Sequence, residues 1–329
     1  MRSQLAPVKL VSIQQPVRDE LDGVHEELAR VVRADFPLIG DVNAHLLQMR
    51  GKLFRPTLLL LAARSADRMT RTKVALAATI ELIHLATLVH DDSVDHSVLR
   101  RGQPTINAMF SHQVAVIMGD YLYSRAIIEL VRLANLDALR VVSRVTNQMT
   151  VGEMRELEAH DALDYSEGSY DALIKAKTAS LMSGACEVGA IDAVPRQRDA
   201  LQRFGMHLGM AFQITDDVLD YTESEAVTGK PSGLDLREHK ITLPLILALP
   251  QMTEGERTVV RQLMHEPAPS DDQIAGVVGI VDRCEGVSGA RARAAAFAER
   301  AGDELAVLPD GPARDALELC ITYAIERRS

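Results

Sequence analysis

Apolar residues recur at helical spacing along almost the whole chain. Leu, Val, Ile and Ala repeatedly occupy positions three and four apart, which is the period of one helix face, and Ala and Leu are strong helix formers. We find no convincing strand-like alternation, so we predict an all-α fold. The predicted helices are Val17–Ala34, Leu53–Ser65, Arg71–His90, Val114–Leu133, Leu136–Ala159, Tyr170–Ala190, Gln197–Tyr221, Thr242–Leu249, Glu254–His265, Asp271–Val281, Ala290–Leu305 and Gly311–Arg327.

Loops and domain organisation follow from the Gly, Pro and polar residues between these helices. The longest polar connection, residues 223–240, is a candidate mobile lid. No low-complexity linker divides the chain, so we expect a single domain spanning residues 1–329. Gly and Pro gather at residues 101–104, 228–233, 266–270 and 309–312, which predicts loops there.

Composition narrows the function classes. The 329 residues are 47% hydrophobic and 25% charged, which is typical of a soluble globular protein, and the net charge of -10 argues against nucleic-acid binding. Cys186, Cys284 and Cys320 have no metal-ligand spacing and form no even set for disulfides, so we expect a cytoplasmic protein. The apolar runs Thr57–Ala63 and Ile241–Leu249 are too short to span a bilayer, which leaves at most a peripheral membrane contact.

Two aspartate clusters of the same form, D-D-x-x-D, each end an apolar predicted helix. The first is DDSVD at residues 91–95, and the second is DDVLD at residues 216–220. Helical residues four apart share a face, so the outer aspartates of each cluster would repel one another unless a cation lay between them. Carboxylate oxygens suit Mg2+, which is often shared with substrate phosphates. One cluster alone has an ordinary reading as a charged helix face, but two predict a diphosphate site.

Basic residues at the ends of predicted helices would complete such a site. Lys52 and Arg55 lie three apart at a helix start, where backbone N–H groups favour anions. His84 lies about two turns before the first cluster on an apolar helix, where a histidine is more often an ordinary core residue. Arg100 and Arg101 follow the first cluster and suit bidentate phosphate contacts.

These motifs together resemble the trans-polyprenyl (isoprenyl) diphosphate synthases. The matching stretches occur in family order, cover roughly Pro16–Leu249, and leave residues 250–329 matched only as helices. They are GKLFRP, ELIHLATLVHDDSVDHSVLRRGQPT, VAVIMGDYLYSRA, KTASL, FQITDDVLDYT and GKPSGLDLREHKITLPLI. The resemblance implies an isoprenoid synthase fold, a large helical bundle around a deep central cavity, and a homodimer. It also implies head-to-tail condensation of isopentenyl diphosphate with farnesyl, geranyl or geranylgeranyl diphosphate.

The resemblance also assigns roles to individual residues. Asp91 and Asp95 would hold two Mg2+ ions, Asp216 a third, and Mn2+ is expected to substitute. Asp217 and Asp220 are expected to act near the third ion, and Asp92 to support the first cluster. Arg100, Lys177, Gln213, Lys230 and Lys240 would contact the allylic diphosphate or its metals, and Lys52, Arg55, His84 and Arg101 would bind isopentenyl diphosphate. Thr178 and Gln213 would stabilise the allylic cation.

Two positions depart from the family pattern. His239 stands where the family often has Gly, and Glu156 stands where Gln is common. Neither is an expected metal ligand, so both bear on details of the lid and the cavity.

Product length depends on the residues beneath the first cluster. A growing chain would run down the helix past Ala86 and Thr87, which are small and leave the first turn open. Because a helical turn rises about 5.4 Å, close to the reach of one isoprene unit, we predict a long product of about C30 to C50. Tyr123 and Ile127 are candidates for the floor of the cavity.

Several alternatives remain open. A shorter-chain synthase making farnesyl or geranylgeranyl diphosphate would share all these motifs, as would a subunit of a heteromeric synthase. A class I terpene cyclase shares the first cluster, but its second motif usually carries Asn, Ser and Glu. A di-iron carboxylate bundle needs two Glu-x-x-His pairs, and only Glu81 to His84 fits.

Overall fold

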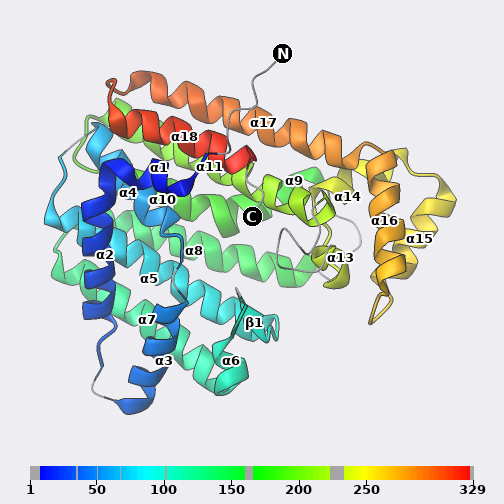
Figure 1. Ribbon diagram of the computed structural model, residues 1–329, viewed down its shortest axis with the longest axis horizontal. Helices are drawn as coiled ribbons and strands as arrows, with labels where there is room; N and C mark the ends of the chain where they lie inside the picture. Colours follow the sequence, from blue (N-terminus) through cyan, green and yellow to red (C-terminus); the bar gives the residue numbers. More distant parts are fainter. Residues whose placement is uncertain are drawn as a thin grey trace.

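Long helices run side by side through the middle of the computed structural model (Figure 1). It describes residues 8–34, 36–49, 51–66, 68–100, 102–159, 166–222 and 233–326. The first half of the chain forms α1 (Leu10–Gln14), η1 (Gln15–Val17), α2 (Arg18–Val31), α3 (Pro37–Gln48), α4 (Phe54–Ala66), α5 (Arg71–Val94), α6 (Ile106–Met109), α7 (His112–Arg132) and α8 (Leu136–Ala159).

The second half continues the bundle and then adds shorter helices at one end. These elements are α9 (Glu167–Ile174), the π-helical η2 (Lys175–Ala179), α10 (Ser180–Gly189), α11 (Pro195–Thr222), α13 (Leu234–Arg237), α14 (Leu243–Ala248), η3 (Leu249–Gln251), α15 (Glu254–Met264), α16 (Asp271–Arg283), α17 (Gly286–Glu304), η4 (Leu305–Val307) and α18 (Pro312–Glu326). The all-α prediction is confirmed.

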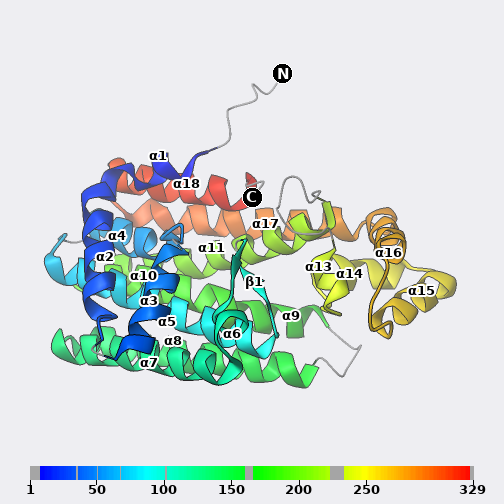
Figure 2. The same cartoon turned by 60° about the horizontal axis from the view of Figure 1, so that its bottom comes forward.

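Two hydrophobic clusters form the core, and the long helix α11 contributes to both. Its first half packs with α4, α5, α7, α8 and α10 in the larger cluster. Its second half packs with α9, α14, α16 and α17 in the smaller one. Figure 2 shows α7 along the edge of the bundle opposite α17 and α18, and α2 crossing one end of the long helices. The far end, with α13 and α14, is where α11 presents its aspartates.

Some elements differ from the predictions. A hairpin of β1 (Leu99–Arg100) and β2 (Gln103–Pro104) pairs antiparallel after the first aspartate cluster, although we expected no strands. Helix α3 was not predicted. It begins with Pro at its first turn, a favoured position, but Gly40 and Asn43 weaken its pattern.

Helix α5 is the one described helix that is long and apolar enough to cross a bilayer by length and composition. However, 67% of its most apolar window is buried inside the protein. The Thr70 side chain caps its first turn by accepting from the Lys73 N–H. Because most of its apolar residues are buried, α5 is a core helix of the larger cluster. Its last turn carries the first aspartate cluster.

Candidate active site

The first aspartate cluster occupies the last turn of α5. Asp92 is buried and accepts a hydrogen bond from Arg100 Nε at 2.7 Å, so it ties the hairpin to the helix. Asp91 and Asp95 lie on the more exposed side, one turn apart. Burial raises the pKa of Asp91 above its usual value, the Lys177 ammonium opposes this, and the Asp95 charge adds to it. These carboxylates crowd one another in a way that a cation would relieve.

The second cluster ends α11, and its members face different surroundings. Asp216 is exposed, whereas Asp217 is buried. The Tyr170 hydroxyl donates to one oxygen of Asp217, and Gln213 Nε2 donates to the other at 2.8 Å. Burial raises the pKa of Asp217 to about 7, against the lowering effect of these donors. Two side-chain donors therefore fix the orientation of the Asp217 carboxylate, next to Asp216 in the sequence.

Asp220 anchors the chain where it returns after residues 223–232. Its two carboxylate oxygens accept the backbone N–H groups of Leu234 and Asp235, each at 3.0 Å, at the start of α13. Burial and the charge of Asp217 raise the pKa of Asp235 well above its usual value. Lys230 lies outside the described residues, so its predicted contact with the allylic diphosphate stays a prediction.

Lys177 and Lys240 place positive charge beside the first cluster. Lys177 Nζ lies 2.7 Å from Glu153 Oε1 and 2.6 Å from Glu156 Oε2, and its charge acts on Asp91. Burial lowers the pKa of Lys177, but the carboxylates around it outweigh this and raise it above its usual value.

Lys240 approaches the first cluster from the other side. Its Nζ lies 3.8 Å from Asp95 Oδ2 and 2.9 Å from Glu238 Oε2. Its charge also acts on Asp235, beside the second cluster. Both lysines therefore act on the first cluster, and Lys240 also acts on Asp235, whose pKa the charges of the second cluster raise.

The π-helical turn η2 presents Lys177 and Thr178. Such turns are rare and often occur at functional sites. The Thr178 hydroxyl donates to Gln213 Oε1 at 2.8 Å, which connects η2 to the second cluster. Two glycines let neighbouring helices approach this turn. A Cβ at Gly209 of α11 would lie 2.5 Å from Ala179 Cα, and one at Gly152 of α8 would lie 2.8 Å from Ala176 Cβ.

A second basic group forms at the start of α4. Arg55 Nη1 lies 2.9 Å from His84 Nε2, and Lys52 Nζ lies 3.5 Å from the Tyr323 hydroxyl of α18. Leu53, between Lys52 and Arg55 in the sequence, has a φ of 48°, in the left-handed region that non-glycine residues rarely adopt.

Aromatic rings connect this group to α11. The ring of Phe54 stacks on Phe212, which is the neighbour of Gln213, with centroids 5.6 Å apart. The structure thus pairs Arg55 with His84, while Lys52 at the same helix start contacts Tyr323; their binding of one ligand stays a prediction. Arg101 lies outside the described residues.

The chain-length candidates lie on different faces. Thr87 is half-buried on the side of α5 that carries Asp91, whereas Ala86 is 2% exposed in the larger core. On α7, Tyr123 is 38% exposed and donates to Thr146 Oγ1 of α8 at 3.2 Å, and Ile127 packs partly against the core. Their roles in product length stay predictions.

Sequence reasoning missed several residues that hold this site. It did not find Tyr170, Glu153 or Asp235, and it noted Glu156 only as a departure from a pattern. Tyr170 lies about two turns before Lys177, and a polar residue at that spacing was the one available signal. The carboxylates around Lys177 come from α8, 21 residues away in the case of Glu156, and helical periodicity does not indicate such a contact.

Comparison with known proteins agrees with this geometry. The sequence pattern of the polyprenyl synthetase family matches residues 36–281. The all-trans-nonaprenyl-diphosphate synthase (geranyl-diphosphate specific) of Rhodobacter capsulatus is 40% identical over 319 residues, 96% of this chain and 97% of that protein. Heptaprenyl diphosphate synthase component 2 of Geobacillus stearothermophilus is 34% identical over 322 residues, 97% of this chain and 99% of that protein.

A solved structure shares the whole fold. The polyprenyl synthase of Caulobacter crescentus CB15, complexed with calcium and isoprenyl diphosphate, superposes with a TM-score of 0.93 at 31% identity. The match covers 99% of this chain and 100% of that one.

Proposed function

The chain belongs to the polyprenyl synthetase family, and we propose that it condenses isopentenyl diphosphate head-to-tail with an allylic diphosphate to make an all-trans polyprenyl diphosphate of about C30 to C50. One observation carries the proposal: Lys177 and Lys240 act on the first aspartate cluster, and Lys240 also acts on Asp235 beside the second. We assign the allylic diphosphate to these groups, and isopentenyl diphosphate to Lys52 and the Arg55–His84 pair at the start of α4.

Magnesium fits the aspartates of the proposed allylic diphosphate site. The donors are carboxylate oxygens, which hard cations prefer, and Asp91 and Asp95 repel one another without a cation. Among the described residues no three His, Cys, Asp or Glu side chains are grouped to hold a metal on their own. On the family pattern, three ions would be shared between Asp91, Asp95, Asp216 and the diphosphate. Bound magnesium would neutralise charge on the departing diphosphate.

The residues of the protein have three tasks in the reaction. Lys177, Lys240 and Arg100 bind the diphosphate, so that the allylic C–O bond breaks with its electron pair leaving on oxygen. The oxygens of Thr178 and Gln213, which share a hydrogen bond, would stabilise the resulting cation. The double bond of isopentenyl diphosphate, held by Lys52, Arg55 and His84, then forms the new C–C bond. The proton released in this step passes to the departed diphosphate.

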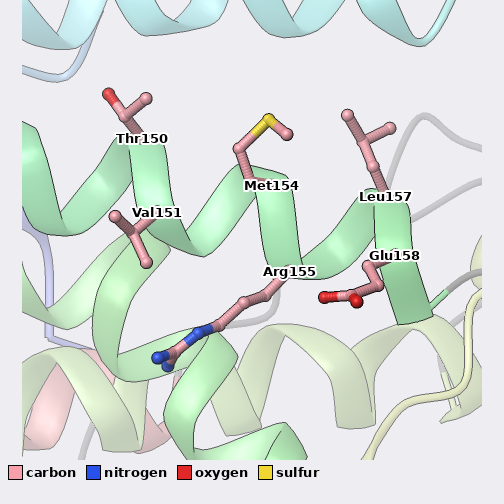
Figure 3. Close-up of a pocket in the computed structure, with 6 residues that line it drawn as sticks. All are labelled: Thr150, Val151, Met154, Arg155, Leu157 and Glu158. Carbon is pink, nitrogen blue, oxygen red and sulfur yellow. The ribbon is translucent and has the colours of Figure 1, made fainter.

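A second copy of the chain is the proposed partner. Large apolar side chains are exposed along α7 and α8, and contiguous patches of this kind mark interfaces. A groove of about 600 Å³ lies along the end of α8, where Figure 3 shows Met154 and Leu157 projecting to the same side. The exposed residues are Val116, Ile117, Tyr123, Ile128, Val131, Leu136, Val151, Met154 and Leu157.

Light scattering tests this interface. We expect twice the chain mass for the parent and a monomer for Met154→Glu. A monomeric parent would contradict the homodimer and favour a heteromeric synthase, of which the Geobacillus relative is by its name one component.

A product assay tests the reaction. The purified chain is incubated with Mg2+, isopentenyl diphosphate and farnesyl diphosphate, and the products are sized. We expect about six to ten isoprene units, from the open first turn beneath Asp91. Products that stop at C20 would keep the chemistry and overturn the long-chain proposal. If there is no condensation with farnesyl, geranyl or geranylgeranyl diphosphate, the chain is not a self-sufficient synthase.

A further inference from the structure

Glu156 is a carboxylate in direct contact with a lysine of the proposed allylic site. It lies on the inner side of α8, one turn after Glu153, and its Oε2 accepts from Lys177 Nζ at 2.6 Å. Its side chain is 24% exposed and that of Lys177 is 30% exposed, so the pair lies half-buried at the edge of the site. Gln is common at this position in the family that the sequence resembles. The uncharged amide of Gln would not attract the ammonium as a carboxylate does.

The surroundings keep Glu156 ionised. Burial acts to raise its pKa, but the Lys177 charge and hydrogen bond, together with the charge of Lys240, bring the pKa below its usual value. Its negative charge also acts on Asp91. Glu156 is therefore an anion placed among the groups that are proposed to receive the diphosphate.

An anion at this place has a defined electrostatic consequence. An ammonium has three N–H donors, and Glu153 and Glu156 both draw on those of Lys177. A diphosphate that arrives must share this ammonium with them and must approach the charge of Glu156. Both effects weaken the hold of the site on the substrate diphosphate and on the diphosphate that is released.

We propose that Glu156 is a positioning residue that competes with diphosphate for Lys177, and that it thereby weakens substrate binding and speeds release of the diphosphate product. The inference rests on the proposed function, in which Lys177 binds the allylic diphosphate. It assigns to this chain a property that a relative with Gln at this position would lack.

The test compares Glu156→Gln with the parent enzyme and with Glu299→Gln. Glu299 is exposed on α17, at the edge of the bundle opposite α7, so Glu299→Gln removes the same charge away from Lys177 and from the proposed interface. Titration calorimetry measures binding of inorganic pyrophosphate in the presence of Mg2+, which needs no turnover. Steady-state assays give KM for farnesyl diphosphate and kcat.

Glu156→Gln should bind pyrophosphate about three- to tenfold more tightly and lower KM by a similar factor, the effect of one like charge in a partly solvated site. Its kcat should not rise, because the diphosphate leaves more slowly. Glu299→Gln should match the parent. Unchanged or weaker pyrophosphate binding by Glu156→Gln, with circular dichroism like the parent, would overturn the proposal and make Glu156 a support for Lys177. A parent that binds no pyrophosphate would instead contradict the proposed function.

Discussion

Gly209→Ala tests whether the close approach of α11 to the π-helical turn positions the catalytic groups. Gly209 lies one turn before Gln213 on the same face of α11. The added Cβ would lie 2.5 Å from Ala179 Cα and 2.8 Å from Ala179 Cβ. Carbon atoms pack at about 3.5–4.0 Å, so the helix and the turn must separate by about 1 Å. This movement would lengthen the hydrogen bond from Thr178 to Gln213 and displace Lys177.

The magnitudes distinguish an effect on activity from an effect on stability. Overpacking costs about 1–3 kcal/mol, and Ala in place of Gly within a helix returns about 1 kcal/mol, so the net loss of stability is about 0–2 kcal/mol. A 1 Å displacement of catalytic groups costs on the order of 100-fold in rate, or about 2.7 kcal/mol. We therefore expect a folded enzyme with kcat/KM reduced on the order of 100-fold.

The assay measures kcat and KM for farnesyl and isopentenyl diphosphates, with thermal unfolding followed by circular dichroism. Gly276→Ala is the matched control, because Gly276 is also helical and a Cβ there meets nothing within 4 Å. The control should keep full activity and unfold at the same or a higher temperature. If Gly209→Ala keeps the kcat/KM of the parent, the glycine does not position η2 and the argument is refuted.

Three further predictions concern product length, metal use and acid stability. Thr87→Phe should shorten the product toward C15 or C20, since Thr87 shares a face with Asp91; an unchanged length would contradict this path for the chain. Tyr170→Phe should raise the Mg2+ concentration for half-maximal activity about three- to tenfold, because Asp217 loses a donor that favours its ionised form; an unchanged Mg2+ titration would contradict it. Glu129→Gln should destabilise the fold by about 1–3 kcal/mol at pH 7 in urea unfolding, and by less as the pH falls through 4.

The sign of the last prediction follows from the pKa of Glu129. Burial acts to raise this pKa, but hydrogen bonds and charges from Arg132 and Arg30 bring it below the usual value. A carboxylate with a folded pKa below its unfolded pKa contributes stability above the unfolded value, near 4.3. That stability is lost as the pH falls through the folded value. A difference between parent and variant that grows toward pH 4 would contradict the assignment.

The long amphipathic helices and the order of the motifs could be predicted from the sequence. Helix α8 begins and ends where its periodicity predicts, at Leu136 and Ala159, although the core covers only its first part, from Ala138 to Met149. Helix α5 runs past its predicted end at His90 to Val94, since the aspartate cluster itself is helical. The predicted family, the all-α fold and the prenyltransferase class are confirmed by the comparisons.

Contacts between elements could not be predicted in the same way. The predicted helix Tyr170–Ala190 is interrupted by the π-helical turn, which has no signature in apolar spacing. Periodicity reports which residues of one helix share a face, but not which side chain of another helix meets that face. The pairing of Tyr170 with Asp217, 47 residues apart, depends on how α9 packs against α11.

The two departures from the family pattern, His239 and Glu156, both lie next to a lysine. His239 has a φ of 56°, in the left-handed region where Gly is favoured, and its ring bonds the Glu266 carbonyl at 2.9 Å, which offsets part of the strain. It directly precedes Lys240, just as Glu156 directly contacts Lys177. One unusual residue thus contacts a lysine of the proposed allylic site, and the other adjoins the second lysine in the sequence. The two D-D-x-x-D clusters of the sequence pattern are present, and the departures lie beside Lys177 and Lys240.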